Sequence, residues 1–262
     1  MYDLIVIGGG PGGYEAAAHA GRMGKKVALV EQRQLGGACL HVGCIPTKTF
    51  LKASKLLAEC RQAQAYGLRV AGAEIDMPAL VRRKEKIVGA LTRGVGSLLK
   101  RSGVEVIEGR GRLRSRSVVE VDGQGYEAAN ILLATGARPA VPPIPGIDSE
   151  AVLDSSSILN LEQVPETLAV IGGGYIGLEF ASFFAEAGSR VTGIEMLPAV
   201  ASGCDAQISR RLLSAIRKSG VTVHLSARVT GVDGRALHYQ TEDGAAATVA
   251  ADYILNATGR TP

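Results

Sequence analysis

Two cysteines, Cys39 and Cys44, lie close together in the segment Leu35-Gly-Gly-Ala-Cys-Leu-His-Val-Gly-Cys-Ile-Pro-Thr-Lys48. This segment directly follows a strand–helix–strand pattern that is typical of nucleotide binding. A close thiol pair can form and break a disulfide, and it can thereby exchange electrons with a bound cofactor. We expect redox chemistry at this pair, and the alternative is two buried cysteines beside a flexible loop.

The residues around the pair favour a short glycine-rich turn followed by a helix. Proline is tolerated in the first turn of a helix, so Pro46 predicts a helix that begins near Cys44. A thiolate at that end would be stabilised by the helix dipole and by Lys48. The glycines at 36, 37 and 43 let the backbone bend and let a flat cofactor come close.

The cysteine count argues against two other uses of the thiols. The four cysteines (39, 44, 60 and 204) do not make a disulfide framework in a chain of 262 residues. Zinc would need two further ligands at suitable spacing, and only His41 lies near the pair. We therefore expect no metal site, and we interpret Cys60 and Cys204 as ordinary residues of a helix and a loop.

The nucleotide-binding pattern occurs twice without a gap. Residues 4–15 match residues 168–179, an offset of 164 because 168 − 4 = 164. Each copy has an apolar strand, a Gly-x-Gly-x-x-Gly turn, a helix of small residues and a second strand that ends in an acid. Two complete copies make dinucleotide binding far more specific than one glycine motif would.

Each residue type in this pattern has a physical role. The first glycine permits the tight turn, the second lets a pyrophosphate approach the backbone, and the third lets the helix pack on the strand. The terminal acid can accept hydrogen bonds from a ribose. In chain order, the first copy has Gly8, Gly10, Gly13 and Glu31, and the second has Gly172, Gly174, Gly177 and Glu195.

A second internal match marks where the repeats end. Residues 131–139 and 254–262 both read as a short buried strand followed by a Thr-Gly turn. From the middle glycine to this turn the first copy has 136 − 10 = 126 residues and the second has 259 − 174 = 85, so the first is about forty residues longer. The extra length includes the cysteine segment and helical stretches around 46–63 and 77–102.

These patterns predict an α/β protein with two Rossmann-like dinucleotide-binding domains in tandem. The first domain, 1–148, carries a helical and β insertion, and a proline-rich linker at 139–148 leads to the second, 149–262.

No apolar run is long enough for a membrane span, and the chain enters a strand at once, so we expect a cytoplasmic protein. Aromatic residues are scarce, and the arginines at 110, 112, 114 and 116 read as one solvated strand face, so we expect no nucleic-acid partner.

The cysteine segment closely resembles the active-site motif of the flavin-dependent disulfide reductases, the pyridine nucleotide-disulfide oxidoreductase family. The resemblance covers the whole chain, because the two glycine motifs, the cysteine motif and both Ala-Thr-Gly turns occur in the family's order. It implies that the first domain binds FAD and the second a nicotinamide dinucleotide. It also implies that Cys44 contacts the flavin and that Cys39 exchanges with the substrate disulfide.

Other roles are carried over by resemblance. Lys48 resembles the lysine that approaches the flavin, paired with a glutamate matching Glu179, whose alternative is a helix-surface charge. Tyr175 resembles a residue that covers the nicotinamide pocket, with a packing aromatic as the alternative. The remaining cofactor-binding positions implied by the resemblance are Gly37, Gly111, Thr135 and Gly136 for FAD and Val229 and Gly259 for NAD.

Two positions favour the dihydrolipoamide dehydrogenase branch of the family. Glu195 is followed by Met-Leu-Pro rather than by arginines, which favours NAD over NADP. Thr47 lies where lipoamide-type members carry serine or threonine. The implied reaction passes electrons from a dithiol through the Cys39–Cys44 disulfide to FAD and NAD+.

His41 replaces the family's usual asparagine, and we expect a tolerated substitution in a turn, so that His41→Asn leaves flavin reduction nearly unchanged.

Members of the family continue beyond the point matched by Pro262, with the rest of the FAD domain and a dimerisation domain that carries a His-Glu pair. The resemblance therefore implies a truncated form with little turnover, whose longer form is a homodimer, acts on lipoamide and belongs to a 2-oxo acid dehydrogenase complex. One alternative is a short, non-catalytic nucleotide-binding protein that senses redox state. Another is a different member of the family, such as mercuric or glutathione reductase.

Overall fold

The computed structural model describes all 262 residues, and the chain folds into two compact units. The first unit comprises residues 1–46, 85–138 and 262, and the second comprises 47–84 and 139–261. The domain boundaries expected from the sequence follow the two nucleotide-binding repeats rather than these units, and they stay a prediction. None of the helices combines the length and the apolar character that crossing a bilayer requires.

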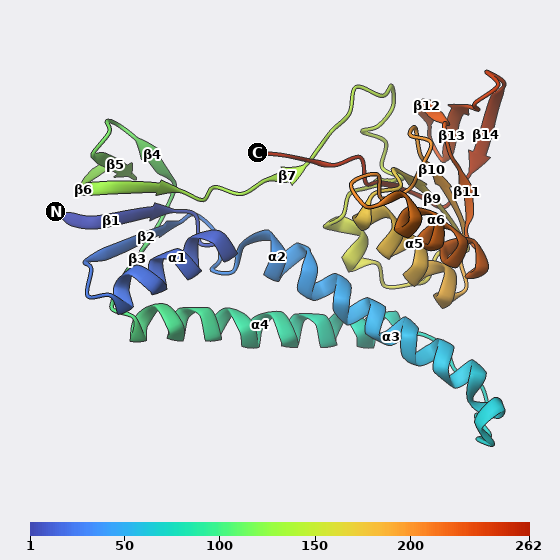
Figure 1. Cartoon of the computed structure of the whole chain (residues 1–262), viewed down its shortest axis with the longest axis horizontal. Helices are drawn as coiled ribbons and strands as arrows, with labels where there is room; N and C mark the ends of the chain where they lie inside the picture. Colours follow the sequence, from blue (N-terminus) through green and yellow to red (C-terminus); the bar gives the residue numbers. More distant parts are fainter. The chain divides into compact units, whose positions relative to one another are not determined.

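The first unit is built on a six-stranded sheet in the order β3-β2-β1-β6-β5-β4 (Figure 1). Strands β1, β2, β3 and the end of β6 run parallel, whereas β4 and β5 continue the sheet in antiparallel fashion. The strands are β1 (Tyr2–Ile7), β2 (Val27–Glu31), β3 (Val104–Glu108), β4 (Gly111–Leu113), β5 (Val118–Val121) and β6 (Gln124–Leu133).

Both faces of the first sheet are covered, which explains why its central strands read as continuous apolar runs. On one face, Val6 and Leu29 pack with Val95 and Leu99 of α4 (Met77–Arg101), and α1 (Pro11–Arg22) covers the same face. On the other face, Ile5 and its neighbours pack on apolar residues of β5.

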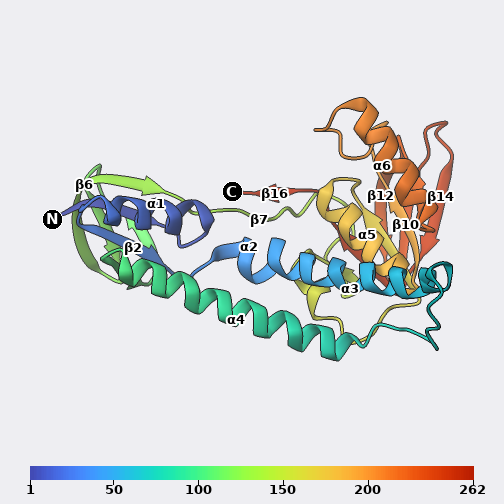
Figure 2. The same ribbon diagram turned by 60° about the horizontal axis from the view of Figure 1, so that its bottom comes forward.

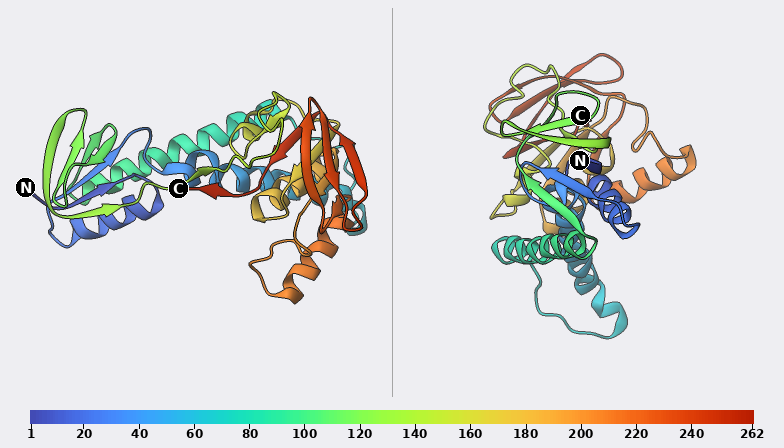
Figure 3. Two further views of the ribbon diagram at one scale, coloured as in Figure 1. Left: turned by 90° about the horizontal axis from the view of Figure 1, so that it is seen from above. Right: turned by 90° about the vertical axis from the view of Figure 1, so that its left-hand side faces the viewer.

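The second unit contains a parallel sheet in the order β11-β10-β9-β15-β8. Helices α5 (Tyr175–Ala187) and α6 (Ala206–Lys218) pack on one face of this sheet, as Figure 2 shows. A three-stranded antiparallel sheet, drawn in orange to red in Figure 3, packs on the other face. The strands are β8 (Val152–Leu153), β9 (Thr167–Ile171), β10 (Arg190–Ile194), β11 (Thr222–His224), β12 (Arg228–Asp233), β13 (Ala236–Gln240), β14 (Ala246–Ala250) and β15 (Tyr253–Asn256).

The fold confirms the duplication read from the sequence. The orders β3-β2-β1-β6 and β11-β10-β9-β15 are the same arrangement, and both match the dinucleotide-binding order 3-2-1-4. Between β2 and β3 the first copy inserts α2 (Gly37–Val42), α3 (Cys44–Gln62), a 3-10 turn η1 (Ala63–Tyr66) and α4. The second copy has only α6 between β10 and β11, so the helical insertion is confirmed. The other short elements are η2 (Ser157–Asn160) and the paired strands β7 (Arg138–Pro139) and β16 (Arg260–Thr261).

One sequence-based expectation about the strands is wrong. The four alternating arginines do not share a strand face, because β4 holds only Arg112. The strand is delimited by Gly109, whose φ of +137° breaks the extended conformation, and by the turn that follows Leu113. Arg114 instead forms an ion pair with Glu120.

The glycine turns give a direct test of the packing that holds each helix against its strand. A Cβ at Gly13 would lie 1.8 Å from the carbonyl oxygen of Gly8, whereas a Cβ at Gly12 would meet nothing within 4 Å. We predict that Gly13→Ala lowers the free energy of unfolding by about 1–3 kcal/mol. The control Gly12→Ala should leave it unchanged or raise it by about 0.5–1 kcal/mol, because alanine favours helix. Urea unfolding of both variants measures the difference, and equal stability would contradict this packing.

Candidate functional site

The first glycine turn is held in shape by Glu31, at the end of β2. One carboxylate oxygen accepts the Gly9 N–H at 2.7 Å, and the other accepts the Arg33 N–H at 2.8 Å. Gly8 has a φ of +108°, and a Cβ there would lie 2.2 Å from the carbonyl oxygen of Ala134. The acid therefore fixes the turn and the loop after β2 together, and each carboxylate oxygen keeps a further lone pair for a ligand.

The start of α1 offers the features that a pyrophosphate needs. Gly10 is the N-cap residue, and a Cβ added to it would meet only the Cα of Gly37, at 3.8 Å. No side chain caps α1. By contrast, the carboxylate of Asp205 caps α6 by accepting the N–H groups of Gln207 and Ile208. The uncapped N–H groups and the open space above Gly10 fit the pyrophosphate of a dinucleotide such as FAD.

The cysteine segment lies directly on this turn. The Gly36 N–H donates to the carbonyl oxygen of Gly9 at 2.8 Å. Gly37 has a φ of +58°, and a Cβ there would lie 2.6 Å from the Cα of Gly10. The two backbones approach this closely only because position 37 is glycine. The structure therefore brings Gly37 together with the first glycine turn.

The two cysteines lie on consecutive helices. Cys39 is half-buried on α2, Cys44 is exposed as the first residue of α3, and the structure contains no disulfide. The helix expected to begin near Cys44 is confirmed. Sequence reasoning missed Tyr14 on α1: burial raises the pKa of its phenol, and the nearby Glu15 and Cys39 raise this pKa further. No residue pattern indicated that Tyr14 lies near Cys39, because the second copy has leucine at the matching position.

The expectation for His41 needs correction. This residue belongs to α2 rather than to a turn, and its ring is half-buried. Its Nε2 lies 2.9 Å from the carbonyl oxygen of Leu35. A carbonyl only accepts, so Nε2 carries the hydrogen of this bond.

In the second unit, α3 is fastened to α5 along its length. Lys48 and Glu179 form an ion pair, and the rings of Phe50 and Phe183 lie 5.0 Å apart between centroids. Near the end of α3, Arg61 donates to the carbonyl oxygen of Glu186 at 2.8 Å. The lysine and the glutamate singled out from the sequence thus lie together as an ion pair. The Phe50 and Arg61 contacts were missed, because they join residues more than 120 positions apart.

The second glycine turn repeats the construction of the first. The buried carboxylate of Glu195 accepts the N–H of Gly173 with one oxygen and that of Leu197, at 2.7 Å, with the other. A Cβ at Gly174 would meet nothing within 4 Å, and no side chain caps α5. This site fits a second dinucleotide, such as NAD, by the same physical criteria.

Tyr175 is the first residue of α5, and its side chain is 60% exposed beside this turn. Its hydroxyl lies 3.4 Å from the sulfur of Cys204, and this hydrogen bond raises the pKa of Tyr175. Sequence reasoning treated Cys204 as an ordinary loop residue and missed the contact, which no local pattern signals.

The remaining predicted cofactor positions lie in turns or short strands. In the first unit, a Cβ at Gly111 would meet Ile7 at 3.1 Å, so Gly111 lies beside the end of β1. The backbone nitrogen of Thr135 lies close to Gly8, and Gly136 follows it with a φ of +74°. In the second unit, Gly259 has a φ of +132°. Val229 lies on β12 opposite Tyr239.

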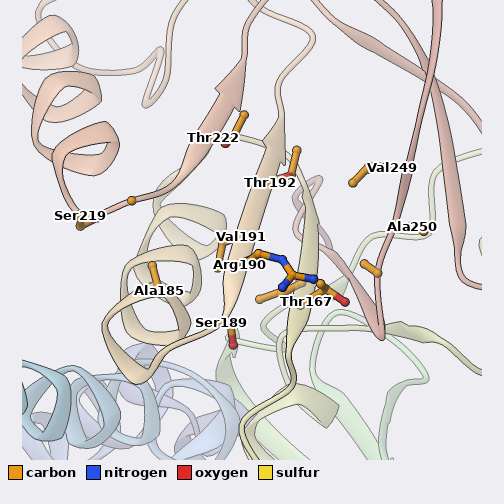
Figure 4. Close-up of a pocket in the computed structure, with 13 residues that line it drawn as sticks. Thr167, Ala185, Ser189, Arg190, Val191, Thr192, Ser219, Thr222, Val249 and Ala250 are labelled. Atoms are coloured by element: carbon orange, nitrogen blue, oxygen red, sulfur yellow. The ribbon is translucent and has the colours of Figure 1, made fainter.

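A pocket of about 460 Å³ does not belong to either glycine turn (Figure 4). It lies in the second unit at the amino ends of β9, β10 and β11, and nucleotides bind at the carboxyl ends of such strands. Its main polar side chains already have partners, since Thr167 bonds to Asp252 and Arg190 pairs with Glu166 at 2.8 Å.

Comparison with known proteins agrees with this geometry. The family model described as pyridine nucleotide-disulphide oxidoreductase matches residues 2–262. A dihydrolipoyl dehydrogenase of Acholeplasma laidlawii is 39% identical over 263 residues, which are 98% of this chain and 78% of that protein. Dihydrolipoyl dehydrogenase 3 of Pseudomonas aeruginosa is 42% identical over 276 residues, covering all of this chain and 58% of the relative.

A solved structure has the same fold. The HOCl-induced flavoprotein disulfide reductase RclA of Escherichia coli superposes with a TM-score of 0.83 at 32% identity, covering 100% of this chain and 57% of that one. The chain thus spans little more than half the length of this structure and of most of the relatives.

The buried carboxylate of the second turn provides a test of the site's construction. In Glu195→Gln one oxygen still accepts an N–H, but the amide nitrogen then faces a second N–H and leaves it unsatisfied. We predict a loss of about 1–3 kcal/mol in the free energy of unfolding. Urea unfolding, with hydrogen exchange of residues 172–201 as the local readout, measures it. The exposed Glu242→Gln is the control, and equal exchange in both variants would contradict the proposed role of the carboxylate.

Proposed function

The chain belongs to the pyridine nucleotide-disulphide oxidoreductase family, and from this premise we propose that it passes electrons from a dithiol through Cys39 and Cys44 to FAD and then to NAD+. The family uses FAD and NAD(H). One observation carries the proposal: the cysteine segment is fastened to the first glycine turn by the Gly36 N–H and by the close approach of Gly37 to Gly10. A thiol pair beside a dinucleotide cradle is suited to electron exchange.

The first step is an exchange between the substrate and the Cys39–Cys44 disulfide. A substrate thiolate attacks the sulfur of Cys39, and Cys44 leaves as a thiolate. The second substrate thiol then attacks the mixed disulfide and releases Cys39. One disulfide bond forms in the substrate while one breaks in the protein, so two electrons and two protons enter the cysteine pair.

The chain's other residues hold and orient the reactants. The uncapped start of α1 and Glu31 bind the pyrophosphate and ribose of FAD, which when bound takes the electron pair from the dithiol and delivers it as a hydride. Lys48 forms an ion pair with Glu179 and, by resemblance to the family, would supply a positive charge to the bound flavin. Gly174 and Glu195 would bind the pyrophosphate and ribose of NAD, as Gly10 and Glu31 would bind those of FAD. Tyr175 would cover the nicotinamide.

We extend the proposal to the dihydrolipoyl dehydrogenase type, because the curated relatives carry that name at about 40% identity. Dihydrolipoamide is then the dithiol substrate, and lipoamide is the disulfide product. A homodimer within a 2-oxo acid dehydrogenase complex is the corresponding assembly for a chain of the relatives' full length. The absence of an arginine after Glu195 favours NAD over NADP.

The two cradles can be tested separately, because both middle glycines tolerate a Cβ in the nucleotide-free fold. Gly10 and Gly174 have extended backbones with φ of −73° and −75°, and neither Cβ would clash with the protein. We predict that Gly10→Ala lowers the affinity for FAD about tenfold or more and spares NAD+ binding, and that Gly174→Ala does the reverse. The added methyl takes the space of the pyrophosphate.

Fluorescence titration with each nucleotide measures the two affinities, and melting temperatures equal to wild type show that the fold is intact. Gly12→Ala is the matched control, since its Cβ also meets open space. Unchanged binding of both nucleotides in both variants would reject the assignment of the cradles, as would a wild-type chain that binds neither.

A further inference from the structure

Helix α2, which carries Cys39, cannot hold its position by itself. It has six residues, far fewer than an isolated helix needs, and it lies between Gly36 and Gly43 without a side-chain cap. Leu40 anchors it through burial in the core beneath α1. Burial of one leucine fixes where the helix packs, but it does not fix how the helix is joined to the glycine turn.

His41 supplies that connection through a single peptide group. Its Nε2–H donates to the carbonyl oxygen of Leu35 at 2.9 Å, and the N–H of the same peptide, on Gly36, donates to Gly9 at 2.8 Å. A peptide group is planar and rigid, so holding both its ends fixes its plane. The Gly9 N–H in turn bonds to Glu31. A continuous path of hydrogen bonds therefore runs from Glu31, through Gly9 and the Leu35–Gly36 peptide, to His41 on α2.

We propose that His41 is a positioning residue that joins α2, and with it Cys39, to the FAD-binding turn. This inference rests on the proposed function for the identity of the nucleotide, although the hydrogen-bonded path itself does not. A nucleotide that orders the Gly9–Gly10 turn then also steadies the helix that carries the exchanging thiol. Nε2 keeps its hydrogen in the protonated ring and in the neutral tautomer that this bond selects, so the connection needs no charge on the ring.

The position of the donor atom separates this role from that of a tolerated surface residue. The amide nitrogen of glutamine reaches about as far from Cα as Nε2 does, whereas that of asparagine reaches only as far as Nδ1. His41→Gln should therefore keep the bond to Leu35, and His41→Asn should lose it. This expectation replaces the one drawn from the sequence, in which asparagine was equivalent.

The test is the alkylation of Cys39 by iodoacetamide in the nucleotide-free chain, quantified for each cysteine by mass spectrometry. Wild type, His41→Gln, His41→Asn and His41→Ala are compared, with Cys60 on α3 as the internal reference. Loss of one hydrogen bond, about 1 kcal/mol, corresponds to a roughly fivefold change in local opening. We expect the ratio of Cys39 to Cys60 alkylation to rise about fivefold in the asparagine and alanine variants and less than twofold in the glutamine variant.

Binding of FAD gives a second, independent readout. We expect FAD to slow Cys39 alkylation in the wild type and in His41→Gln more strongly than in His41→Ala. A glutamine variant that behaves like alanine, or four proteins with the same alkylation ratio, would overturn the proposal. If the ratios follow the expected order but no protein binds FAD, the connection through His41 stands and the proposed function fails. If His41→Ala does not fold, the comparison of glutamine with asparagine decides.

Discussion

The close approach of two backbones, at Gly10 and Gly37, is the constraint on which the rest of the candidate site depends. A Cβ at Gly37 would lie 2.6 Å from the Cα of Gly10, and Gly37 adopts a φ of +58° that side chains disfavour. With glycine at position 37, the Gly36 N–H can reach Gly9, and α2 begins directly beside the first glycine turn. This contact joins the start of the helix that carries Cys39 to the first glycine turn.

The two copies of the nucleotide-binding pattern are built in the same way. In both copies a glutamate at the end of the second strand holds the glycine turn, Glu31 through Gly9 and Glu195 through Gly173. Both copies leave the start of the helix after the turn uncapped, as a phosphate requires. The copies diverge after the acid, where the first inserts α2, α3 and α4 and the second continues into a loop and α6. The cysteine segment is thus an addition to one of two similarly built glycine turns.

Much of the architecture could be predicted from the sequence, because it is encoded in local patterns. The repeat, the helical insertion and the start of α3 at Cys44 follow from glycine spacing, the unequal lengths of the two copies and Pro46. Contacts between distant residues carry no such signal, which is why the position of Tyr14 near Cys39 and the bond between Tyr175 and Cys204 were missed. The alternating arginines gave a wrong prediction for a different reason. Their local pattern is typical of a strand, but the turns on either side of β4 end the strand before it can include all four.

Anaerobic titration of the purified, FAD-loaded chain with dihydrolipoamide, followed by visible absorption, tests the central claim most directly. If Cys39 and Cys44 exchange electrons with the flavin, the dithiol produces a long-wavelength charge-transfer band in the wild type, and Cys44→Ser abolishes that response. A flavin spectrum that does not respond to the dithiol, or a response that survives in Cys44→Ser, would contradict the account.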